Sequence, residues 1–297
     1  MHFALTSDQR DFRAALEDLL GCSDTVGAAR AWADGDHAPG LGLWKRLHEL
    51  GVTGLIVPEE DGGLGGSLVD LVVAHEALGH HLAVGPWIES SAYLAVLPEH
   101  RGRVAQGELL TVAAPYALDA DVADLVGGTP GERVESIDPT RRLYRVSTGA
   151  VAEGAAFDIA ALAAAAQLLG AGERVLTEAV GYVQQRQQFG RPIGSFQAVK
   201  HRLADVRIAL DFARPLIYGA AAGAGPDPHP RSVSAAKAFA ADAAWQAARA
   251  ALQVHGAVGY TRELDLGLWI LRIRALRSAW GTPGWHRARV LESLVAR

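Results

Sequence analysis

Apolar residues recur every three or four positions through much of the first hundred residues, which is the spacing of an amphipathic helix. In SDQRDFRAALEDLL the residues Phe12, Leu16 and Leu20 share one face, and Ser7 is a suitable N-cap residue. A second helix is predicted over LWKRLHEL, where the leucines repeat at the same spacing and Gly51 ends the helix. The first third of the chain is therefore expected to be helical.

Two breaks in this pattern divide the chain. Pro58 and the glycines of DGGLGG predict a loop, after which Ser67 begins a further helix. From about residue 108 to 150 the helical spacing gives way to short pieces, LLTVAAPY, ADLVGG and RLYRVSTG, which suit a few short strands. Because a stable sheet needs three or more supported strands, this segment is expected to lean on the helices.

The last half of the chain returns to helical spacing. DIAALAAAAQLLGAGERVLTEAVGYVQQR predicts one long helix ending near Arg186, and further helices are expected to begin near Ser195, Ser232 and Leu264. Short connections fit antiparallel neighbours in a bundle. The alanine-rich faces either let helix axes approach closely or reflect a simple alanine bias. The prediction is a mainly α protein with an N-terminal helical domain (1–107), a reduced β segment (108–150) and a C-terminal four-helix bundle (151–297).

Composition narrows the functional classes. The chain has 297 residues, of which 49% are hydrophobic and 21% charged, as expected of a soluble globular protein. Its start carries charges rather than the pattern of a signal peptide, so a cytoplasmic protein that does not enter a membrane is expected. A net charge of -5 argues against a nucleic-acid partner. Cys22 is the only cysteine, which excludes cysteine zinc sites within the chain, and we expect no metal.

Five segments, taken in order, resemble the acyl-CoA dehydrogenase family. They are LTSDQRDFR, WKRLHELGVTGLIVPEEDGGLGGSLVDLVVAHEALG, GERVLTEAVGYVQQRQQFGRPIGSFQAVKHRLADV, ALQVHGAVGYTRELDLGLWILR and WGTPGWHRARV. The third and fourth are the most specific, and together the segments cover most of the chain. The resemblance implies the family's arrangement of helical N-terminal domain, β middle domain and C-terminal bundle.

The resemblance also implies FAD. In the family the arginine of an R-x-x-F-G turn reaches the pyrophosphate and adenosine part of a flavin held mainly by the partner subunit, and here that residue is Arg186, with Gln188 and Phe189 beside it. A guanidinium offers bidentate donors to a diphosphate. The alternative is that Arg186 pairs with a carboxylate at a helix end. The other positions that the resemblance assigns to the cofactor are Gln197, Gln253, Gly256 and Thr282.

The catalytic base of the family has no counterpart. Most members carry a glutamate in a Tyr-Glu-Gly-Thr turn, where this chain has Trp280, and an indole cannot accept a proton. Other members place the base on the first bundle helix, where this chain has Ala160. We therefore expect no catalytic residue at either position. Residues of a suitable type for a relocated base are His75, Glu76, Asp158 and His255.

The middle segment departs from the family as well. In the family the middle domain normally has about a hundred residues and holds the flavin ring, whereas this chain has about forty residues there. APYALDAD occupies the position where the family has a T-E-P-x-A-G-S-D stretch. The chain is therefore not expected to hold a flavin ring by itself.

The leading hypothesis is a shortened, base-less subunit of a heteromeric (α2β2) FAD-dependent acyl-CoA dehydrogenase, of the kind that resembles actinobacterial enzymes of steroid side-chain catabolism. The expected partners are a full-length dehydrogenase subunit carrying the glutamate, an acyl-CoA substrate and electron-transfer flavoprotein. One alternative is an independent homomeric acyl-CoA flavoenzyme with a displaced base. The other is a flavin-free scaffold or acyl-CoA-binding protein.

Overall fold

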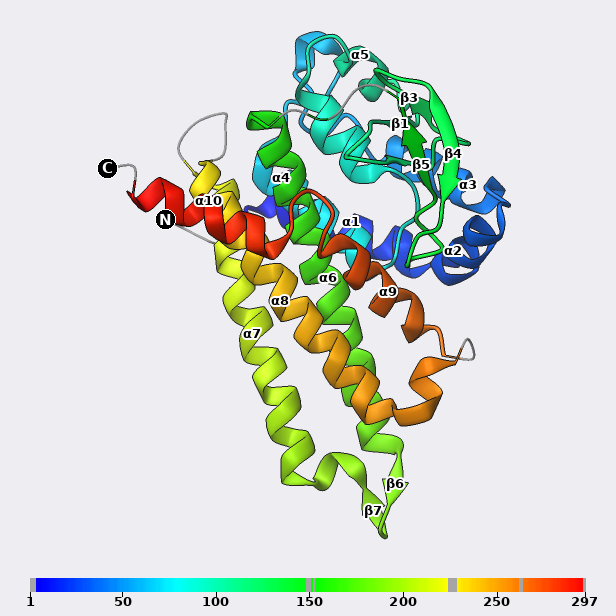
Figure 1. Ribbon diagram of the computed structural model, residues 1–297, viewed down its shortest axis with the longest axis vertical. Helices are drawn as coiled ribbons and strands as arrows, with labels where there is room; N and C mark the ends of the chain where they lie inside the picture. Colours follow the sequence, from blue (N-terminus) through cyan, green and yellow to red (C-terminus); the bar gives the residue numbers. More distant parts are fainter. Residues whose placement is uncertain (1–3, 148–150, 152, 224–228, 262–263, 296–297) are drawn as a thin grey trace.

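Long helices dominate the computed structural model, which describes residues 4–147, 151, 153–223, 229–261 and 264–295. The N-terminal helices are α1 (Ser7–Gly21), α2 (Thr25–Asp34), α3 (Ala38–Glu49), α4 (Leu68–His80) and α5 (Arg101–Ala105). The C-terminal helices are α6 (Ala155–Gln185), α7 (Gln197–Ala221), α8 (Pro230–His255), α9 (Leu266–Leu276) and α10 (Pro283–Val295). Figure 1 shows α6, α7 and α8 extending beyond the other elements, which gather around their upper ends. The predicted mainly α architecture is confirmed.

Two of the N-terminal helices, α1 and α4, begin at capping boxes. Thr6 precedes α1, its hydroxyl accepts the Gln9 backbone N–H at 3.2 Å, and the Gln9 side chain accepts the Thr6 N–H at 3.1 Å. The expectation that Ser7 caps this helix was wrong, because Thr6 holds the extended backbone that an N-cap requires. Ser67 caps α4 as predicted, in the same reciprocal arrangement with Asp70.

The middle of the chain forms small sheets. Its strands are β1 (Leu110–Thr111), β2 (Ala117–Leu118), β3 (Asp124–Leu125), β4 (Pro130–Val134) and β5 (Leu143–Val146). β1 pairs in parallel with β3, and β5 lies between β2 and β4 with antiparallel pairing. Asp119, which follows β2, accepts the indole N–H of Trp32 in α2 at 3.1 Å. The strands therefore pack against the helices, as predicted. Residues 148–150 of the predicted segment lie outside the described residues.

Helix α6 runs through the centre of the molecule. It packs against α4, α7, α8 and α9, and by length and hydropathy it could cross a membrane. In its most apolar window, however, 83% of the residues are buried inside the protein. A Cβ placed on Gly172 of α6 would lie 3.3 Å from Cα of Ala244 in α8, so small residues let these two axes approach closely.

Two glycines form the crossing of α4 and α6. A Cβ on Gly79 would overlap the backbone of Gln167, and a Cβ on Gly170 would overlap the carbonyl oxygen of Glu76. The backbones of the two helices are therefore in direct contact, which joins the N-terminal helices to the bundle.

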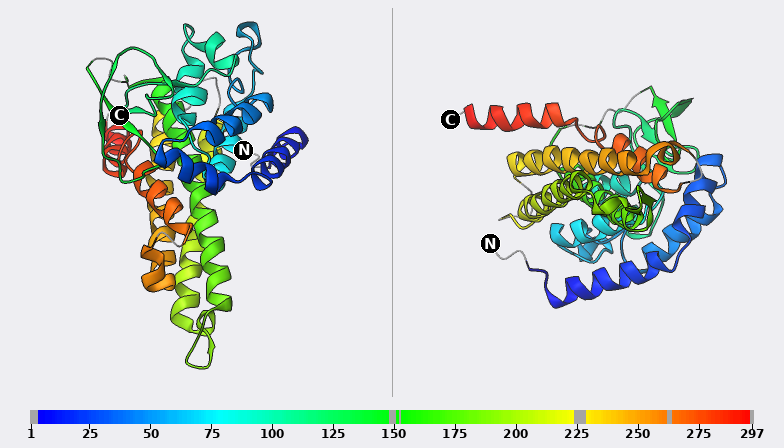
Figure 2. Two further views of the ribbon diagram at one scale, coloured as in Figure 1. Left: turned by 90° about the vertical axis from the view of Figure 1, so that its right-hand side faces the viewer. Right: turned by 90° about the horizontal axis from the view of Figure 1, so that it is seen from below.

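A hairpin of β6 (Gln187–Gln188) and β7 (Arg191–Pro192) connects α6 to α7 at the lower end of Figure 1. At the opposite end of the bundle, α10 lies along the outside of α8, on the side away from α7 (Figure 2). The sequence pattern did not predict α10, which begins at Pro283.

Candidate functional site

The tip of the β6–β7 hairpin is a two-residue turn with an exposed aromatic side chain. Phe189 has φ of 53° and Gly190 has φ of 77°, the pair of positive values that a type I′ turn requires. Glycine adopts this conformation freely, whereas a phenylalanine adopts it at a cost. The Phe189 side chain is 91% exposed. Within the chain its ring meets that of Phe196 edge to face, with centroids 6.2 Å apart, and the exposure of the rest of the ring favours a contact outside the chain.

Arg186 lies at the base of the same hairpin. Its backbone ends α6, since its N–H donates to Tyr182 and its carbonyl accepts from Ile193. Its guanidinium is exposed and has no hydrogen-bond or ion-pair partner within the described part of the chain. The alternative of a carboxylate partner at a helix end is therefore not what the structure has. The neighbouring Gln188 is exposed as well.

The ends of α7 and α8 bring two more predicted residues to this region. Gln197 is the first residue of α7 and Gln253 lies in the last turn of α8, and both are exposed. Gly256 follows α8 with φ of 64°. Stacking of the Tyr182 and His255 rings, with centroids 4.1 Å apart, holds the end of α8 against the end of α6.

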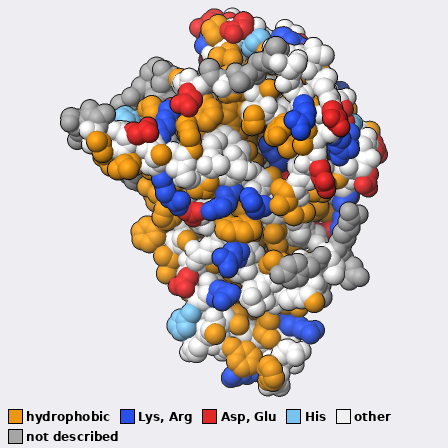
Figure 3. Space-filling model, in the orientation of Figure 1, with side chains coloured by type: hydrophobic (Ala, Val, Ile, Leu, Met, Phe, Trp, Pro, Cys, Tyr) orange, Lys and Arg blue, Asp and Glu red, His pale blue; other side chains and the backbone are white. Residues whose placement is uncertain are grey.

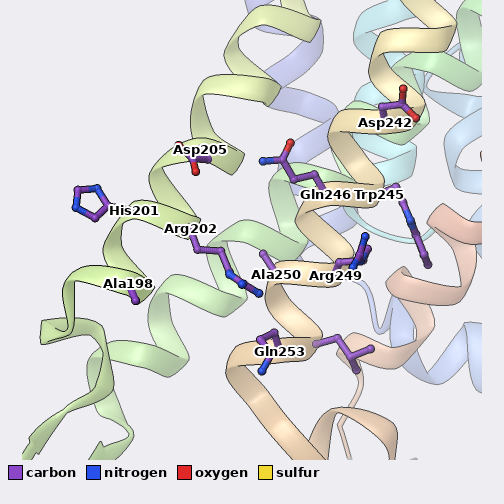
Figure 4. Close-up of a pocket in the computed structure, with 11 residues that line it drawn as sticks. Ala198, His201, Arg202, Asp205, Asp242, Trp245, Gln246, Arg249, Ala250 and Gln253 are labelled. Carbon is purple, nitrogen blue, oxygen red and sulfur yellow. The ribbon is translucent and has the colours of Figure 1, made fainter.

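A groove of about 700 Å³ runs between α7 and α8 and includes Gln253 at its lower end (Figure 4). In Figure 4 Arg202 projects from α7 and Gln246 from α8 into the space between the helices, whereas His201 points away from it. The residues that line the groove are Ala198, His201, Arg202, Asp205, Asp242, Trp245, Gln246, Arg249, Ala250, Leu252 and Gln253.

Thr282 lies elsewhere, in the turn between α9 and α10. Its hydroxyl accepts the backbone N–H of Trp285 at 3.2 Å, and its carbonyl accepts that of His286, so it caps α10. The predicted cofactor residues thus fall into two places: Thr282 beside Trp280, and the others at the hairpin end.

Trp280, in the turn where the family glutamate would stand, is packed into the protein. Its side chain is 3% exposed, and its ring lies 5.4 Å from that of Tyr93 and 5.7 Å from that of Phe157, between centroids. Its backbone has φ of 55°, and its carbonyl accepts a hydrogen bond from Nε2 of His286 at 2.9 Å. The indole therefore fills this position with aromatic contacts instead of a proton acceptor.

A buried carboxyl group lies next to this indole. Glu89, in the π-helical turn Glu89–Tyr93, is 3% exposed, and burial raises its pKa although Arg141 and the Trp280 side chain oppose that rise. Its nearer oxygen is 3.8 Å from the Arg141 guanidinium, and Oε2 has no hydrogen-bond partner among the described residues. Sequence reasoning missed this residue, although a lone glutamate inside the apolar run PWIESSAYLAV was a signal.

A buried lysine supports the Trp280 turn from below. Nζ of Lys237 in α8 donates to the carbonyls of Leu276 at 3.0 Å and Gly281 at 3.4 Å. Burial, with the positive charge of Arg277 as a further cause, lowers the pKa of Lys237 to about 7. Burial likewise lowers the pKa of His286 to about 4. Burial thus shifts both groups that hold the turn toward their neutral forms.

The second expected base position is Ala160, which is completely buried in α6. Among the relocated-base candidates, His75 is also fully buried, between Ser91 at 3.1 Å and Gln167 at 3.1 Å, and burial lowers its pKa to about 3. A group with these contacts stabilises the packing of α4 against α6.

The other three candidates are engaged in hydrogen bonds or ion pairs within the protein. Glu76 accepts hydrogen bonds from Arg214 and from the Tyr218 hydroxyl, at 2.9 Å for the latter. Asp158 pairs with Arg289. Nδ1 of His255 donates to the Ala251 carbonyl at 2.8 Å. Each has a structural partner, which weakens the case for a displaced base. Within the described ranges there is also no cluster of three or more His, Cys, Asp or Glu residues that could hold a metal ion.

Two family models match the chain. The model described as acyl-CoA dehydrogenase, N-terminal domain, matches residues 6–101, and the one described as acyl-CoA dehydrogenase, C-terminal domain, matches residues 148–295. The chain therefore belongs to the acyl-CoA dehydrogenase family of oxidoreductases. Among its relatives, it is 35% identical over 291 residues to acyl-CoA dehydrogenase IpdE2 of Mycobacterium tuberculosis, with 89% of this chain and 90% of the relative covered.

Solved structures show the same fold. The ChsE4-ChsE5 complex from Mycobacterium tuberculosis has a chain that superposes with a TM-score of 0.85 at 22% identity, with 100% of both chains covered. The steroid ACAD Tcur3481-Tcur3483 has a TM-score of 0.85 at 21% identity, with 97% of this chain and 98% of the other covered. At these identities the likeness concerns the fold alone.

Proposed function

We propose that this chain is the base-less subunit of a heteromeric, FAD-dependent acyl-CoA dehydrogenase, and that it completes the flavin site of a full-length partner subunit. The observation that carries the proposal is a contrast within one chain. The hairpin end presents Arg186, whose guanidinium has no partner among the residues that the structure describes, and a strained, exposed Phe189. The position of the catalytic base, in contrast, is filled by the buried Trp280.

The residues at the hairpin end fit the diphosphate and adenine half of FAD. The free guanidinium of Arg186 offers paired N–H donors to a diphosphate, and Gly190 allows close approach of the backbone. The amides of Gln188 and Gln253 are exposed and can exchange hydrogen bonds with an adenine or a ribose. When bound, FAD supplies the hydride acceptor for α,β-desaturation of the acyl-CoA.

The middle segment does not fit the flavin ring. Its strands are two to five residues long, and the connection between β4 and β5 carries the buried Arg141, which pairs with Glu89. The place next to Trp280 is therefore occupied by two buried polar side chains, Glu89 and Arg141, which are unfavourable neighbours for an apolar acyl chain. This arrangement supports a chain whose own acyl site is closed and whose isolated form is inactive.

The proposed partners follow from what this chain lacks. A full-length dehydrogenase subunit would supply the glutamate and the flavin-ring site, an acyl-CoA would be the substrate, and electron-transfer flavoprotein would accept the electrons in the cytoplasm. A steroid-derived acyl group is favoured, because one solved structure of the same fold is described as a steroid ACAD and another is a two-component complex.

The test is FAD retention by the co-expressed complex after dilution and gel filtration. Arg186→Ala removes a charge-assisted contact worth about 1.5–3 kcal/mol, so FAD affinity should fall roughly ten- to a hundredfold. The matched control is Arg13→Ala, an exposed arginine in α1, which should leave FAD retention unchanged. The wild-type complex should hold one FAD per heterodimer.

The alternatives give different results. Unchanged FAD retention by an intact Arg186→Ala complex would remove the central contact of the proposal. An isolated chain that purifies with flavin, and whose flavin is reduced by acyl-CoA, would identify an independent flavoenzyme. A complex with two FAD per heterodimer would contradict a closed site.

A further inference from the structure

A second arginine lies on the same face of the β6–β7 hairpin as Arg186. Arg191 is paired with Gln188, and the N–H of Ile193 donates to the carbonyl of Arg186, so the antiparallel pairing extends to Arg186. Side chains alternate along a strand, and directly paired residues point to the same side. Arg186 and Arg191 are therefore diagonal neighbours, about 7–8 Å apart, and two long side chains at that separation can reach one ligand.

The Arg191 guanidinium is held by an aromatic ring. Its central carbon, Cζ, lies 4.2 Å from the ring centroid of Phe196, the residue before α7, and the same ring meets that of Phe189 edge to face. Stacking uses the face of the guanidinium and leaves the N–H groups at its edge available. Because the side chain is already oriented, it loses less freedom when those N–H groups bind a ligand.

The hairpin end of the bundle carries positive charge without counter-ions of its own. Between residues 179 and 204 the sequence has four lysines or arginines and no aspartate or glutamate. Figure 3 shows hydrophobic, basic and histidine side chains at this lower end. Neither the Arg186 nor the Arg191 guanidinium has a hydrogen-bond or ion-pair partner among the described residues. Two such groups on one face favour an anionic ligand.

We propose that Arg191 is a second ligand of the FAD diphosphate, which it binds together with Arg186 after stacking on Phe196 has fixed its side chain. The proposal rests on the proposed function. A guanidinium offers two parallel N–H donors to one phosphate group, so two arginines on one face match the two phosphates of the cofactor. A carboxylate of another protein would need only one of them, which is why we assign Arg191 to the cofactor.

The opposite face of the hairpin provides a matched control. Pro192 follows Arg191 and points to the other side, where it lines an apolar hollow of about 390 Å³ together with Val183 and Lys200. Lys200 is thus an exposed cation at the same end of the bundle, on the side away from Arg186 and Arg191. Its removal changes the net charge as much as the removal of Arg191 does, without touching the arginine face.

The experiment measures the dissociation constant of FAD from the co-expressed complex by flavin fluorescence, at about 0.03 M and about 0.3 M salt. Arg191→Ala should weaken FAD binding about tenfold at low salt, and by a smaller factor at high salt, because salt screens a contact between a guanidinium and a phosphate. Arg191→Lys should recover part of the loss, since it keeps the charge but not the paired donors. Lys200→Ala should stay within about twofold of the wild type.

Unchanged FAD affinity in Arg191→Ala would overturn the inference. An equal loss at both salt concentrations would also overturn it, because Arg191 would then act only through the fold of the hairpin. So would a complex that dissociates at saturating FAD, since the cation would then meet a carboxylate of the partner. The two proposals fail separately: if Arg186→Ala weakens FAD binding and Arg191→Ala does not, only the role of Arg191 is wrong. If neither variant weakens it, the proposed function fails as well.

Discussion

Arg272 of α9 donates from Nε to the carboxylate of Asp138 at 2.7 Å, and both side chains are buried. The same guanidinium reaches the Thr140 hydroxyl at 2.7 Å and the Ala83 carbonyl at 3.2 Å. One arginine therefore ties the bundle to the β segment and to the turn after α4. The middle segment is short, and this contact holds it against the bundle.

Arg272→Ala should lower the free energy of unfolding by about 3–5 kcal/mol, because it leaves the Asp138 carboxylate buried without its cation. Urea unfolding followed by circular dichroism measures the loss. The control is Arg287→Ala, which removes an exposed pair with Asp242 and should cost less than about 1 kcal/mol. Equal losses in the two variants would contradict the structural role of Arg272.

Lys237 should make stability depend on pH in the neutral to alkaline range. Its pKa is lowered to about 7 by burial, below that of the same side chain in the unfolded chain. Between these two values the unfolded chain binds more protons, so this group makes the protein more stable as pH rises above 7. Lys237→Met should reduce that rise. Unfolding free energies of both proteins at pH 7 and pH 9 provide the test, and an equal rise in the two would rule out Lys237 as its source.

Trp280→Glu should not create a second active site. The new carboxyl group would be buried beside Glu89, and two neighbouring buried carboxyl groups cannot both ionise at low cost. The variant should therefore be less stable at pH 7 than the wild type, by a margin that shrinks at pH 5, and the complex should still hold one FAD per heterodimer. Trp280→Phe is the control, since it keeps an aromatic ring against Tyr93 and Phe157. Desaturation by the isolated Trp280→Glu chain would disprove this expectation.

Phe189→Asn should separate folding from function. Asparagine tolerates the positive φ that Phe189 adopts, so the isolated chain should be equally stable or more stable by up to about 1 kcal/mol. Removal of an exposed aromatic contact should nevertheless reduce FAD retention in the complex. Gly190→Ala serves as the control for backbone strain, because its φ of 77° is unfavourable for alanine. A variant that keeps both stability and FAD would show that Phe189 makes no contact outside the chain.

Local patterns predicted the long helices and the loop at DGGLGG, because periodic apolar residues and glycines act over short distances. Helix α2 was not predicted, because Gly27 interrupts a segment of only ten residues. Helix α10 escaped because it follows a turn-like sequence and exposes leucines such as Leu291. These two errors reflect weak local signals.

The candidate site was predictable only in part. The hairpin around Arg186 is local, so its motif fixed both the turn and the exposed residues. The arrangement of Glu89, Arg141 and Trp280 joins three distant parts of the chain, and only tertiary packing brings them together. For the same reason the sequence could not decide whether His75 is a relocated catalytic base. The contacts of its ring with Ser91 and Gln167 indicate a packing residue.

The backbone contact at Gly79 and Gly170 fixes α4 against α6. A sliding movement of α4 along α6 would drive main chain into main chain, so the crossing resists that movement. Expression of the two halves as separate proteins would expose the apolar surface of α6. The domain boundary drawn from the sequence therefore does not separate two halves that can fold independently.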